Sequence, residues 1–378
     1  MTTSARRVDL VVAELSERDA TSTHVRRIRD LLAEDGHHVR IVVERPTGLD
    51  EDVVLLDRWK ADADLTILQH SIGSRSASEI ARRRIPVVLN YHNITPPEFV
   101  EAWEPQEIQG LRWGRDQLWE LRPVTHHAIA DSEYNARELR AVGMTPVVVA
   151  PVLFDGLGVG GSESADLVGG SGAPSPGCEL VGGSGVPSPG CEGSVTMLFV
   201  GRLSPNKCQQ DLVAALAVLR GGFGLDVRLV LVGSVASVGF VAAVEGLARE
   251  LGVADSVVLA GSVSEAELAG WYGEADVFVC VSEHEGFCVP VVEAMGFGVP
   301  VVAFGAAAVP ETLAGAGVVL GDKSAVSVAS AVARVVSDVG VREELVARGR
   351  VRAAELGLVA SSARMREVLA PLLEQATP

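Results

Sequence analysis

Runs of apolar residues alternate along the chain with amphipathic stretches, and the unit at residues 277–304 is the most sharply defined. Residues 277–281 form an apolar run rich in β-branched side chains, which predicts a buried strand. A polar turn follows over 282–286, and Pro290 stands where a first helical position is expected. Gly298 and Pro300 end a short helix before the next apolar run. The pattern predicts strand, loop, helix and strand, with the loop where open α/β sheets place their ligands.

The first 155 residues repeat this alternation. Apolar runs predict strands at residues 8–13, 39–43, 65–68, 87–89, 128–130 and 147–150. The loop at 14–23 precedes a helix that Thr21 or Ser22 can cap and that Gly36 ends. Such alternation implies a parallel sheet with helices on both faces.

The second half shows the same alternation after a segment of different composition. Strands are predicted at 196–200, 228–232, 257–260, 277–281 and 299–304. Between the halves, residues 156–194 are rich in Gly, Ser and Pro and contain two adjacent 13-residue units, 167–179 and 180–192, that differ at one position. Near-identical copies indicate little packing constraint and predict a flexible linker or surface loop. Pairing or metal binding by Cys178 and Cys191 is the alternative.

These patterns divide the chain into four parts. We predict an N-terminal Rossmann-like domain over 1–155, the linker over 156–194, a second Rossmann-like domain over 195–355 and a C-terminal helix over 356–378. The fold class is α/β, with two doubly wound domains that face a cleft. A chain of 378 residues is long enough for two domains of ordinary size.

Charge and cysteine content exclude several classes of protein. The formal net charge is −17, made of −6 over residues 1–155 and −11 over 156–378, so neither half is a basic nucleic-acid platform. The basic run 82–84 fits a solvated helix end better than a membrane patch. Five cysteines without a Cys-x-x-Cys pattern fit a reducing cytoplasm. Neither a signal peptide nor an apolar run of ~18 residues is found, so we expect a cytoplasmic protein without a transmembrane segment.

The predicted loop of residues 282–289 carries the clearest chemistry. Glu285 lies in the turn and Glu293 on the helix, and the amides of Phe287, Cys288 and Val289 should be free at the helix N-terminus. Free amides bind anions or oxygen atoms, and carboxylates accept hydrogen bonds from hydroxyl groups. The combination suits a ligand with both hydroxyls and phosphate. The alternative is a plain strand–helix–strand crossover with two solvated glutamates.

The same residues carry a resemblance to a known family. Glu285-Gly-Phe-Cys-Val-Pro with Glu293-Ala-Met-Gly-Phe-Gly-Val-Pro resembles the signature of retaining glycosyltransferases of family 4, which have the GT-B fold. Cys288 departs from the glycine usual in that family, which predicts a tighter pocket. The resemblance covers nearly the whole chain except 156–194, and it is strongest at 277–313 and moderate at 196–212. It implies that the C-terminal helix over 356–378 crosses back onto the N-terminal domain.

The resemblance implies roles for residues of the second domain. Gly201-Arg202-Leu203 with Lys207 is similar to a family turn whose cations neutralise the donor diphosphate. Glu293 would accept from the ribose, and Glu285 would hold the transferred sugar with the loop amides. The residues implied in donor binding are Gly233, Ser262, Val263, Gly286, Phe287, Cys288, Val289 and Glu293. Arg202, Lys207, Glu285 and His92 are the implied catalytic residues.

In the first domain the signals are weaker. His92 follows the strand at 87–89 and matches the family's histidine beside the donor sugar, although a structural histidine is the alternative. His24 matches by position without the usual glycines, and an ordinary first-turn residue is the alternative. His70 is a further histidine at a strand end, with a structural histidine as the alternative. Asn93 and Ser132 are further candidates, with a helix N-cap as the plainer role of Ser132. Trp103, Trp113 and Trp119 line an acceptor pocket or pack as ordinary aromatics.

The resemblance implies a function as well as a fold. We expect a retaining, metal-independent transferase that moves a sugar from a nucleoside-diphosphate sugar, bound as substrate and not as cofactor, to a hydroxyl of a small-molecule or glycan acceptor. The pair Asp62 and Asp64 precedes a strand, which is the wrong end of a sheet for a metal site, so we interpret the pair as a solvated helix end. An epimerase or phosphorylase on the same fold, and a catalytically silent partner protein, are the alternatives. A Rossmann oxidoreductase is disfavoured because no Gly-x-Gly-x-x-Gly follows the first strand.

Overall fold

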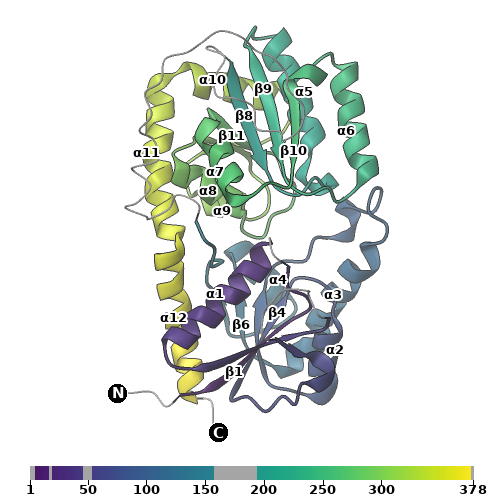
Figure 1. The fold of residues 1–378 in the computed structure, drawn as a ribbon, viewed down its shortest axis with the longest axis vertical. Coiled ribbons are helices and arrows are strands. Elements are labelled where there is room, and N and C mark those ends of the chain that lie inside the picture. Colours follow the sequence, from purple (N-terminus) through teal and green to yellow (C-terminus); the bar gives the residue numbers. More distant parts are fainter. Residues whose placement is uncertain (1–4, 17–18, 46–52, 157–193, 376–378) are drawn as a thin grey trace.

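The computed structural model describes residues 5–16, 19–45, 53–156 and 194–375. Two α/β units are stacked along the long axis of the molecule (Figure 1). The predicted tandem repeat, with Cys178 and Cys191, falls outside the described residues, as does nearly all of the predicted linker.

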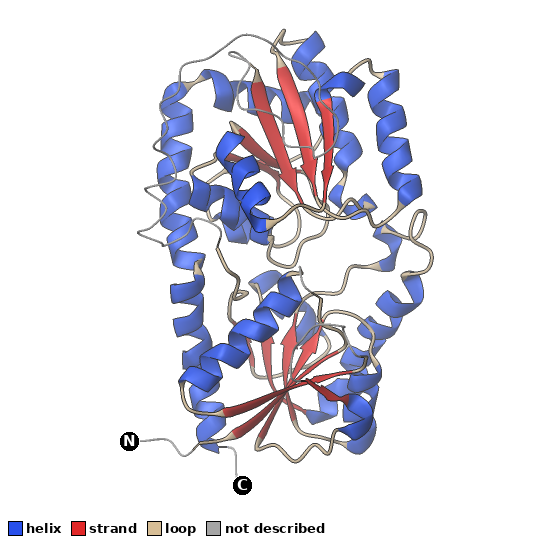
Figure 2. Cartoon of the chain, in the orientation of Figure 1, coloured by secondary structure: helices blue, strands red, loops and turns tan. Residues whose placement is uncertain are grey.

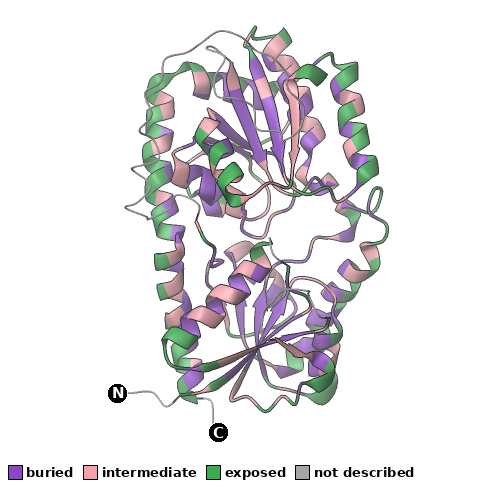
Figure 3. Cartoon of the chain, viewed as in Figure 1, coloured by how far each residue is buried: buried purple, intermediate pink, exposed green. Residues whose placement is uncertain are grey.

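The first unit is built on a seven-stranded sheet in the order β3-β2-β1-β4-β5-β6-β7, and every pairing is parallel. Its strands are β1 (Arg7–Val12), β2 (His38–Val43), β3 (Val53–Leu55), β4 (Leu65–His70), β5 (Val87–Tyr91), β6 (Thr125–Ala130) and β7 (Val147–Val149). Its helices are α1 (Ala20–Glu34), α2 (Arg75–Arg83), α3 (Ile108–Leu121) and α4 (Glu133–Ala141). Alternate residues of β1 enter different cores, with Val8 and Leu10 in one and Val11 in the other. Strands covered on both faces read as continuous apolar runs, which explains the sequence pattern (Figure 3).

The second unit has a six-stranded parallel sheet in the order β10-β9-β8-β11-β12-β13. Its strands are β8 (Val195–Val200), β9 (Val227–Val232), β10 (Val257–Gly261), β11 (Val277–Cys280), β12 (Val301–Phe304) and β13 (Val318–Leu320). Its helices are α5 (Gln209–Gly221), α6 (Val238–Glu250), α7 (Glu265–Glu274), α8 (Val289–Phe297), α9 (Val309–Leu313), α10 (Ala325–Ser337) and α11 (Val339–Leu356). Helix α8 ends where Gly298 adopts the left-handed conformation with φ +76°, as the sequence predicts.

The last helix, α12 (Leu358–Gln375), packs on the first unit although the chain reaches it from the second (Figure 1). Met365 and Leu369 are buried in the core that also contains Leu10. The Arg366 guanidinium binds the Asp35 carboxylate at 2.9 Å. The chain therefore returns from the second unit to the first through α12.

Some local predictions are wrong, each for a physical reason. The short edge strands β3 and β13 were not expected, because three residues are too few to show a period. Asp19 caps α1 in place of Thr21 or Ser22: its carboxylate accepts from Ser22 N–H at 2.9 Å, while the Ser22 hydroxyl accepts from Ser16 N–H. The Asp62 carboxylate lies in a loop rather than at a helix end and binds Arg40 at 2.7 Å.

Candidate functional site

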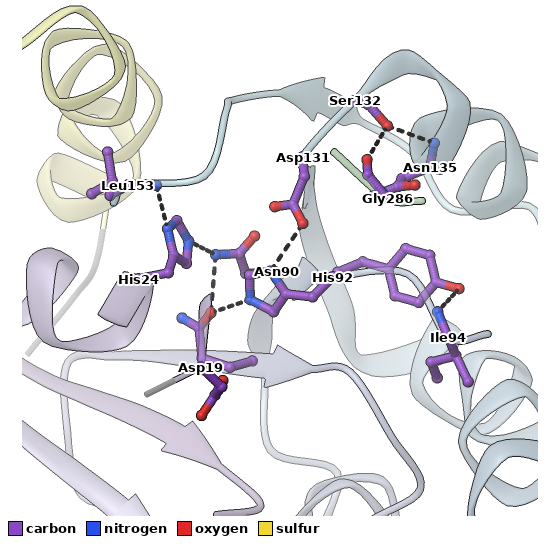
Figure 4. Close-up of polar contacts among 12 residues, drawn as sticks. Asp19, His24, Asn90, His92, Ile94, Asp131, Ser132, Asn135, Leu153 and Gly286 are labelled. Carbon is purple, nitrogen blue, oxygen red and sulfur yellow. Dashed lines mark hydrogen bonds and ion pairs between the residues drawn. The ribbon is translucent and has the colours of Figure 1, made fainter. Parts of the chain in front are cut away.

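The carboxyl ends of the two sheets point toward each other across the middle of the molecule (Figure 2). The Ser132 hydroxyl, at the start of α4, donates to the Gly286 carbonyl, which follows β11, at 2.8 Å (Figure 4). We call this region the interdomain junction. Most candidate residues predicted from the sequence lie in it.

In the loop between β11 and α8, residues 281–288, the carbonyls of residues 284–288 accept hydrogen bonds and the amide of Glu283 donates to the Asn206 carbonyl, whereas the amides nearest α8 are open. The Glu285 carbonyl accepts from Ala308 N–H at 3.2 Å, and the Phe287 carbonyl accepts from the Thr312 hydroxyl. Among the described residues, none accepts a hydrogen bond from the N–H groups of residues 287–289. Such a loop offers donors at a helix N-terminus, which suits an anion or the oxygens of a hydroxylated ligand.

An ion pair lies directly beside this loop. The Lys207 ammonium donates to Glu285 Oε1 at 2.7 Å, and the two side chains are only 20% and 12% exposed. Burial alone would lower the Lys207 pKa, but the Glu285 carboxylate outweighs it and the pKa is raised. The lysine is therefore a fixed positive charge at neutral pH, close to the open amides.

Glu293 is the second carboxylate of the predicted pair, and it occupies a different environment. It is buried on α8, and the Tyr272 hydroxyl donates to its Oε2 at 2.8 Å. Burial raises the Glu293 pKa to about 7, although the hydrogen bond from Tyr272 acts in the opposite direction. Glu293 can therefore change its charge near neutral pH.

Arg202 does not join Lys207 in this structure. Its guanidinium lies 3.3 Å from Glu104 of the first unit, and the buried Glu104 carboxylate also accepts from the Ser204 hydroxyl at 2.6 Å. The Arg202 side chain is 53% exposed and lies at the turn after β8. It can thus approach a ligand only by changing or sharing its contact with Glu104.

Glycines shape the neighbouring turns of the second unit. A side chain at Gly233 would place its Cβ 2.0 Å from the Gly201 carbonyl oxygen, so the turns after β9 and β8 touch through backbone alone. Gly233 N–H donates to the Gly261 carbonyl at 2.8 Å, which brings the turn after β10 alongside. Ser262 is exposed and Val263 half-buried in that turn. These candidates therefore follow three adjacent strands.

A buried polar network fills the facing part of the first unit (Figure 4). Leu153 N–H donates to His24 Nδ1 at 2.8 Å, and the Asn90 amide lies 2.8 Å from His24 Nε2. Because Nδ1 accepts, the neutral ring carries its proton on Nε2, so we assign the Asn90 oxygen to this contact. Burial, and then the nearby His92, lower the His24 pKa well below its usual range. His24 is therefore neutral and joins Leu153 to Asn90 through hydrogen bonds.

The same logic extends to His92. Gln69 lies 3.0 Å from the Asn90 amide and 2.7 Å from His92 Nε2, and His92 Nδ1 lies 3.0 Å from Asp131 Oδ2. The Asn90 oxygen that accepts from His24 Nε2 also faces Gln69. Gln69 therefore donates from its NH₂ group to the Asn90 oxygen and to His92 Nε2. His92 then accepts at Nε2 and donates from Nδ1 to Asp131. The hydrogen bond from Leu153 N–H to His24 Nδ1 thus determines which atom donates and which accepts in every contact of the network.

Several buried polar atoms in the junction have no partner among the described residues. They are both amide atoms of Asn93, both amide atoms of Asn135 and Oδ1 of Asp131. Asn93 holds the left-handed conformation, φ +61°. A Cβ at Gly286 would lie 2.9 Å from Asn93 Cβ and 3.2 Å from Asn135 Nδ2, so these amides adjoin the loop. Buried amides without protein partners usually form hydrogen bonds to a ligand or to water.

Two other histidines and Ser132 have clear structural contacts. His70 donates from Nε2 to the Gly114 carbonyl of α3 at 2.9 Å, and burial lowers its pKa to about 4. It belongs to the packing of α3 and not to the His24–His92 network. Ser132 accepts from Asn135 N–H at 3.2 Å and is thus the N-cap of α4, in addition to its contact with Gly286.

The units also touch through groups that the sequence did not single out. His284 packs between Phe99, at a ring distance of 5.7 Å, and Tyr134, at 6.1 Å. Burial lowers the His284 pKa to about 4, so the ring stays neutral. The Glu311 carboxylate accepts from Glu133 N–H at 2.7 Å, at the start of α4. These contacts hold the units together beside the site.

The tryptophans divide into two kinds. Trp103 packs against Phe240 at a ring distance of 5.7 Å, and its carbonyl accepts from the Ser237 hydroxyl, so it joins the two units. Trp113 and Trp119 are 37% and 56% exposed on α3. Neither reaches the buried network through a contact between described residues.

The sequence also did not single out Gln69, Asn90, Tyr272 and Glu104. Gln69 and Asn90 are polar residues within apolar runs at the ends of adjacent strands, which is a signal that could have found them. Tyr272 and Glu104 offered no local signal, because their partners lie 21 and about 100 residues away.

Known proteins resemble this chain in domain and in fold. Residues 189–352 match the family model described as Glycosyl transferases group 1. The whole fold resembles sucrose-phosphate synthase from Thermosynechococcus elongatus, with a TM-score of 0.73 and 18% identity over 97% of this chain and 99% of that one. It also resembles the Anabaena protein HepE in complex with UDP and glucose, with a TM-score of 0.69 and 17% identity over 97% and 100%. The fold is therefore GT-B.

Among curated proteins the similarity is local. A GDP-mannose:cellobiosyl-diphosphopolyprenol alpha-mannosyltransferase from Xanthomonas oryzae is 37% identical over 102 residues, which is 26% of each chain. The protein of that name from Komagataeibacter xylinus is 50% identical over 48 residues, 13% of this chain and 12% of its own. The match thus spans about a quarter, or less, of these relatives. Within the described ranges, no helix is long and apolar enough to cross a membrane.

Proposed function

We propose that this protein is a retaining, metal-independent glycosyltransferase that moves a sugar from a nucleoside-diphosphate sugar to an acceptor hydroxyl. The observation that carries the proposal is the buried Lys207–Glu285 pair beside three open amides. A lysine and amides can neutralise a diphosphate without a cation, because each supplies a donor to a phosphate oxygen.

The donor would bind across the second unit. Lys207 and the amides of residues 287–289 bind the diphosphate, and Glu293 accepts from the ribose hydroxyls in place of the Tyr272 hydroxyl. Gly233 allows backbone to approach the phosphates, and the turn at 261–263 faces the base. Arg202 leaves Glu104 to join the phosphate.

The sugar would lie between the loop and the buried network of the first unit. Glu285 and the unpartnered amides of Asn93 and Asn135 supply acceptors and donors for sugar hydroxyls. His92, held by Gln69 and Asp131, orients the sugar and the acceptor and does not attack. The network is thus a positioning device built before the ligand arrives.

In the reaction, the bond between the anomeric carbon and the diphosphate oxygen breaks as the acceptor oxygen bonds to that carbon on the same face. The acceptor proton passes to the departing phosphate oxygen, which accounts for retention without a base from the protein. Lys207 and the loop amides stabilise the charge that grows on the diphosphate, which is where preorganised donors contribute most.

The donor is the first thing to establish. The names of the similar proteins contain GDP-mannose in one case and UDP with glucose in another, so the base is left to measurement. Thermal unfolding with UDP, GDP, ADP and dTDP, each with excess chelator, should show a stabilisation of about 2.7 kcal/mol at a hundredfold excess over the dissociation constant for one of them. Product analysis of the matching nucleotide-sugars by NMR should then show a glycoside with the donor's anomeric configuration.

The outcomes separate the competing functions. Stabilisation that appears only when divalent metal is added would overturn the metal-free site. Inverted product would overturn retention, and a modified nucleotide-sugar without transfer would favour an epimerase. Binding without any turnover over a wide acceptor panel would favour a silent partner protein.

A further inference from the structure

Two thiols and a carboxylate meet beneath the loop between β11 and α8. Cys280 ends β11, Cys288 precedes α8, and their sulfur atoms lie 3.9 Å apart. One ligand atom from each of Cys280, Glu285 and Cys288 lies within 4.8 Å of the others. Both cysteines are buried, so this is a closed group of soft and hard ligands rather than a surface cluster.

The distance between the two sulfur atoms fits a tetrahedral metal site. Zinc binds thiolate sulfur at about 2.3 Å, and a tetrahedral angle then separates two such sulfurs by roughly 3.8 Å. The observed distance of 3.9 Å needs almost no movement of either cysteine. Two sulfurs and one carboxylate oxygen leave the fourth position for water or substrate, as in open zinc sites.

The local charge also balances. The group contains one ion pair, between Lys207 and Glu285, beside the two thiols. When both thiols release their protons to solvent and bind a divalent cation together with Glu285, two positive and two negative charges are added, so the buried group stays neutral with Lys207 in place. Buried charge is tolerated only when it is compensated in this way.

Cys288 also occupies an unusual backbone position. Its φ is +72° and its ψ is +66°, a left-handed conformation that favours glycine and is unfavourable for an L-residue. Cys208 offers an internal comparison: it is buried, has φ +56°, precedes α5 and contacts the Lys323 ammonium. Cys208 has no second thiol within reach among the described residues, whereas Cys288 has Cys280.

We propose that Cys280, Cys288 and Glu285 form a binding site for a thiophilic divalent cation such as Zn²⁺, and that the bound ion blocks the junction. The ion takes the carboxylate that Lys207 now holds and fixes the loop whose amides face the ligand. Metal binding itself is independent of the transferase assignment. Only the inhibition rests on the proposed function.

The test uses the full chain, reduced and free of oxygen, with Cys178→Ser and Cys191→Ser to remove thiols outside the described residues. Co²⁺ should bind in a one-to-one ratio and give the absorption of a tetrahedral thiolate site, with charge-transfer bands in the near ultraviolet. Added Zn²⁺ should displace the Co²⁺ and abolish this absorption. Cys280→Ser and Cys288→Gly should each weaken binding roughly a hundredfold or more, since loss of even an outer partner costs 10–100-fold. Cys208→Ser is the matched control and should bind Co²⁺ like the parent.

Folding and oxidation are followed in parallel. Circular dichroism and thermal unfolding establish that each variant is folded, and two independent ligand variants guard against the loss of one. A thiol count before titration must find Cys208, Cys280 and Cys288 reduced. Absent absorption in the reduced parent, or equal absorption in Cys280→Ser, would overturn the site. Loss of two thiols on air exposure, with no metal binding, would show that the two cysteines form a disulfide and would overturn the metal site.

The inhibition is measured separately. Zn²⁺ should lower turnover in the parent and in Cys208→Ser, and chelator should restore it. Each variant is compared with its own metal-free rate, and Cys280→Ser should lose the inhibition. An inactive protein that still binds Co²⁺ would contradict the transferase assignment and leave the metal site standing. Inhibition that persists in Cys280→Ser would overturn the link between this site and activity.

Discussion

The two sides of the interdomain junction are built in different ways. On the side of the second unit, Lys207, Glu285 and three amides are gathered by one loop and one turn, and charge dominates. On the side of the first unit, the polar network is buried, largely neutral, and assembled from residues far apart in the chain, from His24 to Leu153. In the proposed function, one side would bind the ligand through charge and the other through hydrogen bonds whose direction is fixed in advance.

This difference assigns separate tasks to the two sides. A charged cluster with open donors can bind a diphosphate strongly but reads little of its shape, whereas a directed network can distinguish hydroxyl positions. We therefore expect substitutions on the charged side to affect binding and turnover together. Substitutions on the neutral side should affect turnover or sugar choice with nucleotide binding intact.

The largest effect is expected from Lys207→Ala. The change removes the cation from the diphosphate site and leaves Glu285 without its partner, so turnover should fall about 10²–10³-fold. Nucleotide release at saturating donor measures it. Lys323→Ala is the matched control, since Lys323 is a similarly half-buried lysine paired with Glu283 at 2.9 Å, and its turnover should change little. Normal turnover in Lys207→Ala would sink the phosphate assignment.

Next comes Gly286→Ala, which presses the two sides apart. The added methyl would lie 2.9 Å from Asn93 Cβ and 3.3 Å from the His92 carbonyl oxygen, so the junction must open. A displacement of about 1 Å can cost about 10²-fold in rate, while the nucleotide should bind as before. Steady-state kinetics and calorimetry measure the two quantities. Gly270→Ala, whose added Cβ meets nothing within 4 Å, is the control; equal rates in both variants would refute the close approach.

A smaller effect follows from the Glu293 pKa of about 7. Ribose hydroxyls donate to the ionised carboxylate, so donor affinity should rise with pH as the proton leaves, by about tenfold from pH 6 to pH 8. Calorimetric titration with the intact nucleotide-sugar avoids the titration of a terminal phosphate. Glu293→Gln should bind more weakly and lose this pH dependence, and a dependence that survives would assign it to another group.

The smallest effect is expected from Glu311→Ala. This carboxylate binds the first N–H of α4 across the junction, and loss of such a cap costs about 1 kcal/mol. Chemical denaturation should show a reduction of this size, with turnover lowered only a fewfold. A loss of turnover as large as that of Lys207→Ala would mean that Glu311 contacts the ligand.

The same comparison explains what could be predicted from the sequence. Glu285, Glu293 and the open amides fall within one strand–loop–helix unit, so their spacing along the chain is their spacing in the fold. Lys207 could be predicted from the sequence because it follows a recognisable turn. The fold itself followed from apolar runs that parallel strands require on both faces.

Fewer site residues of the first unit could be predicted from the sequence. His92 was a candidate because it ends a strand, but Gln69 and Asn90 acquire meaning only once β4 and β5 lie side by side. Nothing local indicates that Leu153 N–H reaches His24 across 129 residues. Arg202 was expected beside Lys207, yet the structure pairs it with Glu104, because a buried carboxylate from the other unit competes for the guanidinium.

The most direct test of this division of labour is a calorimetric comparison of nucleoside-diphosphate binding, using the nucleotide that stabilises the protein best. The parent, Lys207→Ala and His92→Ala are titrated under chelator, and turnover is measured on the same samples. We predict that Lys207→Ala binds about 10–100-fold more weakly, while His92→Ala binds within about twofold of the parent yet loses turnover. Equal weakening in both variants would contradict the account, since it would show that the two sides do not hold separate parts of the donor.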